Sequence, residues 1–441
     1  MKAVIVSTAP DGTPLASLAR TVEQRLLETG LSPIERFEIS GTRLAYCQGD
    51  FDCWLRTPGR CRVQDGQQAM VRAITSAAAL VLVGPISFGG FGSELERATN
   101  RLLCLLSPFF EKRAYLTHHE PRYARYPSFV SIGLMEREDP YVRATFDALN
   151  DANAINFFAP RRVAVALGRD PATWGSAIGR ALESPRIPGA TLVDRASLRR
   201  ELLEVAGADP GEARPIRTAA LLVGSTKPRG ASVSERLARA FIDRLGAAGV
   251  KCDLHFATEF VHDSAATRER ARAIAAADLF LLATPLYIDA LPSLATRALE
   301  SVAGERHDHA GLFVPLINCG FPEPEHTRTA IRIARTFART AGYRFGGALP
   351  LGGGGAAENA MLETPHGPVV HLVKAIDLAA PALVAGEGVP ANALSEIVQG
   401  VIPESLYRFF GDLGFRYRAY TLGTKQSALN AAPLTAESRS R

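Results

Sequence analysis

The chain has 441 residues, 47% of them hydrophobic, and its 50 basic against 45 acidic side chains give a net charge of +5. This length exceeds what one hydrophobic core usually fills, so we expect two domains. The charges are spread along the chain without a run of five of one sign. This pattern argues against a nucleic-acid-binding protein and against a polybasic membrane patch.

Neither a secretory signal nor a membrane span is predicted. The first apolar run (residues 3–6) is too short for a signal peptide, and no segment carries eighteen uncharged apolar residues. We therefore expect a cytoplasmic protein. Six cysteines are too few for a disulfide framework in a chain of this length, and in a reducing compartment clustered cysteines indicate metal ligands or redox groups.

The first half alternates strand and helix. An apolar strand (residues 2–6) is followed by an amphipathic helix from about Pro14 to Glu28. Further strands are predicted at 34–40, 79–84, 128–135 and 161–167, with helical stretches between them. Strands that alternate with helices predict a parallel sheet covered on both faces.

The second half repeats this order. Its strands are predicted at 217–224, 252–257, 278–284, 311–318 and 344–351. In both halves the third strand ends in a proline loop that leads into a helix, ALVLVGPISFGGFGSELE in the first and DLFLLATPLYIDALPSLA in the second. We interpret this as an internal duplication of a five-stranded α/β unit.

Four regions follow from this pattern. We predict a first domain at 1–170 with a cysteine-loop insertion, a Gly- and Pro-rich linker at 171–215, a second domain at 216–385 and a helical, aromatic extension at 386–441. The extension is expected to pack on its own body or on a twin subunit.

A phosphate-binding loop is predicted after the first strand of the second half. The segment GSTKPRGASVSE (224–235) leaves a buried strand, turns and enters a helix, and it offers hydroxyls, backbone N–H groups and one lysine. It lacks the nucleoside-triphosphate and dinucleotide motifs, so a phosphate monoester such as that of FMN fits better. The alternative is a serine that merely caps a helix on a surface turn.

Two more loops, TPLYIDALP (284–292) and NCGFPEPEH (318–326), follow the third and fourth strands and would meet at the same sheet edge. With these motifs, residues 217–360 resemble the NAD(P)H-dependent FMN reductases of the flavodoxin-like superfamily. The resemblance implies two tandem flavodoxin-like domains and an FMN site in the second. The implied FMN-binding residues are Ser225, Lys227, Ser232, Ser234, Pro285, Leu286, Tyr287, Asn318, Gly320 and Phe321.

The cysteine loop of the first half carries Cys47, Cys53 and Cys61, with Asp50 midway between the first two. Residues 3–167 resemble the iron–sulfur flavoproteins of the same superfamily, whose motif has a cysteine at the position of Asp50. Three outcomes stay open: a [4Fe–4S] cluster with Asp50 or solvent as fourth ligand, a zinc site, or no metal. Cys104, Cys252 and Cys319 lie in apolar surroundings and are predicted to be buried structural thiols.

The first half has a poor phosphate loop, because Asp11 adds a negative charge and the Gly-Ser pair is missing. Its third-strand loop could still line a flavin, or cover one held by the partner domain or another subunit. The candidate residues of that loop are Pro85, Ser87, Phe88, Gly89 and Gly90. The pairs His118/His119 and His307/His309 lie in polar stretches and are predicted to be solvated.

The leading function is an FMN-dependent NAD(P)H oxidoreductase or electron-transfer flavoprotein that serves a small-molecule acceptor or a redox protein. No catalytic side chain can be named, because hydride transfer is the cofactor's chemistry. The alternative is a non-catalytic ligand-binding or assembly protein with one decayed half. A homodimer is one expected assembly. The acceptor and the choice between NADH and NADPH stay open.

Overall fold

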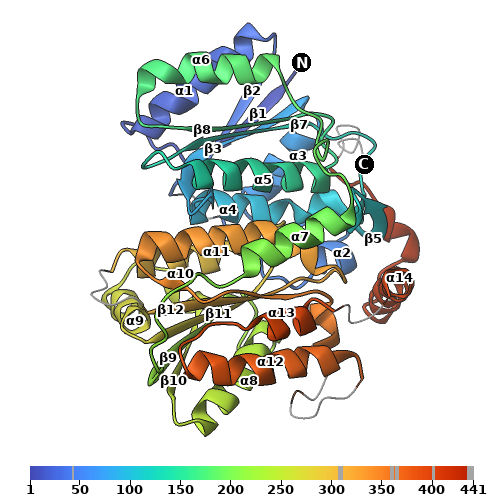
Figure 1. The fold of residues 1–441 in the computed structure, drawn as a ribbon. Helices are drawn as coiled ribbons and strands as arrows, with labels where there is room; N and C mark the ends of the chain where they lie inside the picture. Colours follow the sequence, from blue (N-terminus) through green and yellow to red (C-terminus); the bar gives the residue numbers. More distant parts are fainter. Residues whose placement is uncertain (42–43, 306–310, 358–361, 363–366, 400–402, 435–441) are drawn as a thin grey trace. The chain divides into compact units, whose positions relative to one another are not determined.

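The computed structural model describes residues 1–41, 44–305, 311–357, 362, 367–399 and 403–434. The chain divides into two compact units, Met1–Leu192 with Arg408–Arg441, and Val193–Tyr407 (Figure 1). Each unit has its own sheet. Among the described residues, no helix has both the length and the apolar character that a membrane crossing requires.

The first unit is built on a parallel sheet with the strand order β2-β1-β3-β7-β8. These strands are β1 (Ala3–Ser7), β2 (Ile34–Glu38), β3 (Ala79–Ser87), β7 (Ser128–Leu134) and β8 (Arg162–Leu167), and a two-residue strand β4 (Gly90–Phe91) pairs antiparallel with β3. The predicted first helix is observed with the same bounds, as α1 (Pro14–Glu28). It begins at Pro14 because Thr13 caps it and proline suits the first turn.

Helices cover both faces of this sheet. One face is covered by α1 and α6 (Pro171–Glu183), whose Leu18, Val22 and Trp174 pack in one core with Ile5 and Val81 of the strands (Figure 1). The other face carries α3 (Gln67–Thr75), α4 (Ser93–Asn100) and α5 (Pro140–Asn156). The predicted linker stretch 171–215 thus begins with a helix that packs on α1.

A hairpin that the sequence pattern did not reveal follows the short 3-10 helix η1 (Arg101–Leu105). It consists of β5 (Leu106–Arg113) and β6 (Leu116–Pro121). A short helix α2 (Asp52–Leu55) lies against it, since the indole N–H of Trp54 donates to the Leu106 carbonyl at 3.0 Å.

The C-terminal segment packs on this hairpin region. The last long helix, α14, runs from Glu404 to Thr421 and is followed by η6 (Gln426–Asn430). Phe415 of α14 packs edge-on against Trp54, with ring centroids 5.7 Å apart. Other aromatic side chains of α14 are exposed, namely Phe409, Phe410, Tyr417 and Tyr420.

The second unit has a second parallel sheet with the order β10-β9-β11-β12-β13. Its strands are β9 (Thr218–Val223), β10 (Lys251–Phe256), β11 (Leu279–Pro285), β12 (Leu312–Asn318), β13 (Arg344–Phe345) and β14 (Leu349–Leu351). Its helices are α7 (Arg195–Ala206), α8 (Val233–Ala247), α9 (Ala265–Ala275), α10 (Ser293–Ala303), α11 (Arg328–Ala341), α12 (Val370–Val384) and α13 (Ala391–Ile397). Helices α7, α10 and α11 lie on one face, and α8 and α12 lie on the other (Figure 1).

The fifth strand of this sheet differs from the prediction of one continuous strand over 344–351. It is broken into β13 and β14, which pair with the two ends of β12. Gly346 and Gly347 form the break. A Cβ at Gly346 would lie 2.7 Å from Leu312 Cδ1, and Gly347 has φ +84°. Position 346 therefore needs glycine because side chains of β12 lie close to it, and position 347 favours glycine because of its positive φ.

The predicted fold class is confirmed. Both sheets have the strand order of the flavodoxin-like doubly wound fold, 2-1-3-4-5 in each unit, with helices on both faces. In open sheets of this type ligands bind beyond the carboxyl ends of the strands, so a binding site is expected at that edge.

Candidate functional site

The carboxyl edge of the second sheet brings four loops together. The strand register pairs Val223 with Ala283, Pro285 with Asn318, and Asn318 with Leu351. The strands therefore end at nearly the same level. The loops that leave β9, β11, β12 and β14 consequently start side by side, as predicted for the first three.

The loop from β9 to α8 is held by its own hydroxyl groups. Ser232 caps α8, since its Oγ accepts from the N–H of Glu235 at 3.1 Å, and Ser225 Oγ accepts from the N–H of Lys227 at 3.2 Å. Ser234 donates to Asn318 Oδ1 at 2.9 Å, which ties α8 to the end of β12. The capping role foreseen for a serine here therefore falls to Ser232.

The start of α8 retains donors for an anion. The N–H groups of Val233 and Ser234 have no acceptor within the part of the chain that the structure describes. Such N–H groups at a helix N-terminus attract anions. Lys227 is half-buried and forms no ion pair with a described residue. Its ammonium group is therefore available to a ligand.

One acidic side chain opposes an anion in this loop. Glu235 is buried, and its Oε2 accepts from the N–H of Gly230 at 2.5 Å. Its Oε1 forms an ion pair with Arg239 Nη2 at 2.7 Å, which offsets part of its charge. Glu235 thus stabilises the turn at Gly230. Its negative charge lies near the N–H groups of Val233 and Ser234 and disfavours an anion there.

The loop after β11 forms a tight two-residue turn. Tyr287 and Ala290 exchange backbone hydrogen bonds of 3.0 Å each, and the residues between them, Ile288 and Asp289, have φ of 50° and 57°. A β-branched residue rarely adopts a left-handed conformation, and such conformations cluster at functional sites. The Tyr287 hydroxyl lies 3.4 Å from Thr226 Oγ1 and so joins this turn to the phosphate loop.

The loop after β12 is fixed through its carbonyl groups. The Asn318 carbonyl accepts from the N–H of Leu286 at 2.9 Å, and the Gly320 carbonyl accepts from the Tyr407 hydroxyl at 2.5 Å. Gly320 is exposed, and among the described residues, apart from its two chain neighbours, no atom lies within 4 Å of the position that a Cβ would take there. Phe321, Leu286 and Tyr287 are half-buried. The loop thus presents an open backbone flanked by apolar side chains.

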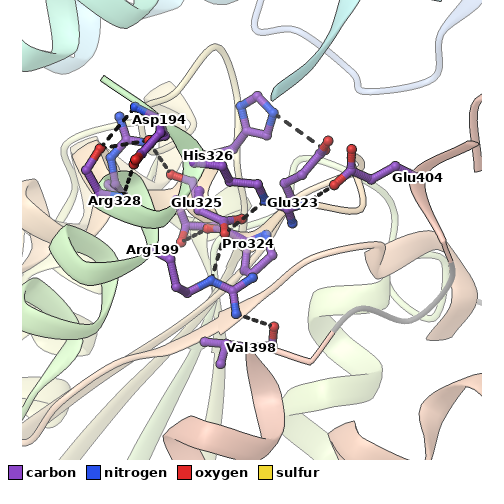
Figure 2. Close-up of polar contacts among 12 residues, drawn as sticks. Asp194, Arg199, Glu323, Pro324, Glu325, His326, Arg328, Val398 and Glu404 are labelled. Carbon is purple, nitrogen blue, oxygen red and sulfur yellow. Dashed lines mark hydrogen bonds and ion pairs between the residues drawn. The ribbon is translucent and has the colours of Figure 1, made fainter. Parts of the chain in front are cut away.

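A buried ionic network holds this loop to α7, and the sequence pattern did not reveal it (Figure 2). Glu325 is fully buried, and its Oε1 accepts from Arg199 Nε at 2.7 Å and from Arg195 Nε at 3.3 Å. Burial favours the neutral acid, but the hydrogen bond and charge of Arg199 outweigh it and hold the pKa of Glu325 below its usual range. Glu325 is therefore a structural carboxylate.

Two more buried acidic side chains, Asp289 and Glu323, flank His326 of the same loop. His326 Nδ1 lies 3.6 Å from Asp289 Oδ1, and its Nε2 lies 4.0 Å from Glu323 Oε2, as Figure 2 shows for the latter. Phe321 packs on the His326 ring with centroids 4.8 Å apart. These side chains connect the β11 turn to the β12 loop. Glu323 and His326 belong to the EPEH run (323–326) of the predicted loop 318–326, but the sequence pattern indicated no role for them.

The first sheet has the corresponding turn but not the anion site. Phe88 and Gly89 have φ of 57° and 95° between the paired residues Ser87 and Gly90. A Cβ at Gly89 would lie 2.6 Å from Thr145 Cγ2, so only glycine fits. These residues and Pro85 lie at the carboxyl edge of β3, where the prediction placed them.

An acidic side chain occupies the phosphate position of the first unit. Glu38 Oε2 accepts from Ser7 Oγ and from the N–H of Ala9, both at 2.8 Å. Two of the donors that could bind a phosphate after β1, the Ser7 hydroxyl and the N–H of Ala9, are therefore already bound to a carboxylate. Asp11 was predicted to repel a phosphate from this loop. The carboxylate that occupies donors of the loop instead belongs to Glu38, at the end of β2.

The cysteine loop contains free thiols. Cys47, Cys53 and Cys61 are half-buried, and among the described residues no group of three or more His, Cys, Asp or Glu side chains could hold a metal ion. Burial raises the pKa of Cys47 to about 11 and that of Cys53 well above its usual range. The thiols of Cys47 and Cys53 therefore stay protonated at neutral pH, which argues against activated nucleophiles at these two positions.

The prediction that His118 and His119 are solvated is wrong. Both lie on β6, where His118 is buried and its Nδ1 is 2.8 Å from Asn156 Oδ1. His119 packs on Trp54 with ring centroids 4.2 Å apart, and burial, aided by the charge of His118, lowers its pKa to about 3. The unforeseen hairpin explains this difference. His307 and His309 lie outside the described residues.

Comparisons with known proteins give limited similarity. No protein-family model matches the sequence, and no curated protein matches it. Among solved structures, an NAD(P)H:quinone oxidoreductase from Methanothermobacter marburgensis is 12% identical, covers 44% of this chain and 99% of its own, and has a TM-score of 0.33.

Two further structures are similar over a shorter part of the chain. An FMN-dependent NADH-azoreductase from Bacillus anthracis, solved with FMN, is 12% identical with 41% and 95% coverage and a TM-score of 0.31. A Streptococcus flavodoxin is 19% identical with 32% and 92% coverage and a TM-score of 0.25. Similarities at this level do not establish a family for the chain.

Proposed function

We propose that the protein is an FMN-dependent NAD(P)H oxidoreductase whose flavin binds at the carboxyl edge of the second sheet. The observation that carries this proposal is the convergence of three loops there. They offer N–H groups at the start of α8 and the Lys227 ammonium, which have no acceptor or acidic partner among the described residues, together with the apolar turn around Tyr287. This set of donors fits a phosphate monoester attached to a flat ring system.

In this proposal the chain's residues bind and orient the cofactor. Val233 and Ser234 would donate their N–H groups to the phosphate, with Lys227 as counter-ion. Leu286, Tyr287 and Phe321 would border the isoalloxazine ring, and the open backbone at Gly320 would face it. Bound FMN supplies the hydride chemistry, in which it accepts two electrons from NAD(P)H and passes them to an acceptor.

We assign one flavin to each chain, in the second unit. The carboxylate of Glu38 holds the phosphate-binding donors of the first unit, and a second negative charge there would be repelled. The loop formed by Pro85, Ser87, Phe88, Gly89 and Gly90 is therefore not assigned a flavin of its own. The acceptor is proposed to be an oxidised small molecule or a redox protein, and the compartment a reducing one such as the cytoplasm.

The test is an FMN titration of the purified chain followed by flavin fluorescence and by thermal unfolding. Wild-type protein is expected to bind FMN and to be stabilised by about 2.7 kcal/mol at one hundred times the dissociation constant. NADPH or NADH should bleach the bound flavin. A chain that FMN neither binds nor stabilises would contradict the proposal and favour a non-catalytic assembly protein.

Two charge changes in the phosphate loop should act in opposite directions. Lys227→Met is expected to weaken FMN binding roughly tenfold, because a charged hydrogen bond to the phosphate is lost. Glu235→Gln should strengthen it roughly threefold, since the amide oxygen can still accept from Gly230 while the repelling charge is removed. Alanine variants of Ser232 and Ser234 would be less selective, because these hydroxyls also support α8 and Asn318.

The matched control is Lys251→Met, at the start of β10 and hence at the opposite edge of the same sheet. Its affinity for FMN should equal that of the wild type. If the Lys227 and Lys251 variants bind FMN with equal affinity, the FMN phosphate does not bind at the loop that carries Lys227.

A further inference from the structure

One face of helix α14 is apolar although it is exposed. From Arg408 onward this helix belongs to the first unit. Five large side chains form the exposed face, each between 54% and 74% exposed, and they are Phe409, Phe410, Leu413, Tyr417 and Tyr420. On a surface helix of a globular protein the exposed face is normally polar. This outer face of α14 therefore indicates a surface that another molecule covers.

The inner face of α14 is already packed on the first unit. Phe415 packs edge-on against Trp54, and Ala419 is fully buried in a small hydrophobic core. An α-helix turns by about 100° per residue, so Leu413 and Tyr417 lie on the side opposite Phe415. The helix is thus apolar on two sides, and the first unit covers only one of them.

The outer face has the residue spacing of a helix that packs along another helix. Its side chains recur at intervals of three, four and three residues, at Phe410, Leu413, Tyr417 and Tyr420. Alternating intervals of three and four keep apolar side chains on one seam between two helices. The charged side chains lie outside this seam. Arg416, for example, lies over the ring of Phe109, 4.3 Å from its centroid.

Two glycines inside α14 differ in their surroundings. At Gly411 a Cβ would lie 2.5 Å from Phe110 Cε2, so the packing of the helix on β5 requires glycine there. At Gly414 a Cβ would meet no atom of the described residues within 4 Å, apart from its chain neighbours and the backbone of its own helix. Glycine inside a helix is less favourable than alanine. No contact within the described part of the chain requires Gly414, whereas a second helix that passes α14 closely would.

The outer face is large enough for a specific dimer. If a complete side chain of this size is taken as about 200 Å², the exposed fractions of the five side chains amount to roughly 600 Å². Two copies that cover each other's outer face would bury roughly 1,200 Å², which lies at the lower end of the range for specific protein–protein interfaces. Residues at the edge of the face would add to this area.

A second copy of this chain is the partner that fits the outer face. A two-fold axis across α14 brings the apolar seam onto an identical seam, so aromatic and leucine side chains meet their like and no charge is buried. A lipid surface would instead favour a helix whose opposite face is strongly basic. On α14 that opposite face is occupied by Phe415 and Ala419, and Asp412 offsets part of the charge of the arginines.

We propose that the outer face of α14 is the interface of a homodimer, in which α14 of one chain packs against α14 of a second copy. The C-terminal extension then packs both on its own body and on a twin subunit, with opposite faces of one helix. The five side chains belong to the first unit, so the proposal does not depend on the flavin in the second.

The test is the mass of the full chain in solution, measured by sedimentation velocity from about 1 to about 100 μM. Wild type is expected to sediment as a dimer of the 47.3 kDa chain. The double variant Leu413→Glu, Tyr417→Glu should raise the dissociation constant at least about a hundredfold, because pairing would bury carboxylates that repel one another. Leu27→Glu is the matched control and should stay dimeric, since Leu27 is 50% exposed on α1, away from this face.

Circular dichroism checks that each variant is folded. If the double glutamate variant does not fold, Tyr417→Ser with Tyr420→Ser removes apolar area without adding charge and should also weaken the dimer. The proposal is overturned if wild type is monomeric at about 100 μM, or if folded outer-face variants dimerise as tightly as wild type. Co-sedimentation with vesicles of phosphatidylglycerol and phosphatidylcholine is measured in parallel. A monomer that binds these vesicles through the outer face would assign the face to a lipid surface and would equally overturn the proposal.

Discussion

Replacing Asp65 by Asn is expected to lower the free energy of unfolding of the first unit by about 3 kcal/mol. Asp65 forms two parallel hydrogen bonds with Arg101, 2.9 and 3.0 Å long, and the Arg101 side chain is 1% exposed. The Asp65 oxygens also accept from the N–H groups of Ala45 and Gln67. An asparagine would point an NH2 group at one of these donors and would leave the guanidinium buried without its counter-charge.

The pH dependence of this effect has a defined sign. Burial favours the neutral acid, but the hydrogen bonds from Arg101, Ala45 and Gln67 prevail and hold the pKa of Asp65 below its usual range. A lowered folded pKa contributes stability above the unfolded pKa of about 3.9 and loses it as the pH falls through the folded value. The difference between wild type and Asp65→Asn should be constant near neutral pH and shrink below about pH 3.9.

Tryptophan fluorescence during urea unfolding measures this change selectively. The chain has two tryptophans, Trp54 and Trp174, and both are buried in the first unit. Asp11→Asn is the matched control, since Asp11 is exposed and forms no ion pair with a described residue, and it should change stability by less than about 0.5 kcal/mol. A similarly small effect for Asp65→Asn would show that the pair contributes little.

Replacing Glu325 by Gln is expected to destabilise the second unit by about 2 kcal/mol. The carboxylate is fully buried, whereas Arg195 and Arg199 are about one-third exposed and remain partly hydrated. Arg195 also pairs with Glu404, and Arg199 donates to the Val398 carbonyl, so both arginines keep a partner. The cost should therefore be smaller than for the Asp65 variant.

The pH profile of the Glu325 effect should have the same sign, because the pKa of Glu325 is also lowered. Its contribution is complete above the unfolded pKa of about 4.3 and declines as the pH falls through the folded value. Circular dichroism in urea between pH 3 and 7 measures it, with the exposed Glu212→Gln as control. A wild-type advantage that grows on acidification would contradict this assignment.

Loss of the Glu325 carboxylate should also affect FMN binding at the candidate flavin site. The residue fixes the β12 loop to α7, and the same loop carries Gly320 and Phe321. We therefore expect weaker FMN binding in Glu325→Gln although this side chain does not contact the proposed cofactor position. A variant with reduced stability and unchanged FMN affinity would show that the loop keeps its shape without the pair.

Local patterns were sufficient for the secondary structure that depends on near neighbours. Thr13, Pro14 and the apolar spacing after them define α1, and the continuous apolar runs define the buried strands of both sheets. The hairpin β5–β6 was missed because its pairing depends on contacts with Trp54 and the C-terminal segment. The break between β13 and β14 depends on the close approach of β12. Neither feature has a periodic signal.

The amino-acid order alone determines two α/β sheets and the loops that leave their carboxyl edges, because apolar periodicity and turn residues act over a few neighbouring positions. Folding decides which charges enter those loops. Glu38 occupies donors of one anion site from an adjacent strand, and Gln67 donates to Cys104 Sγ from 37 positions away in the chain. Such encounters arise when distant segments are buried together, where low dielectric makes every charge and thiol depend on partners that spacing cannot reveal.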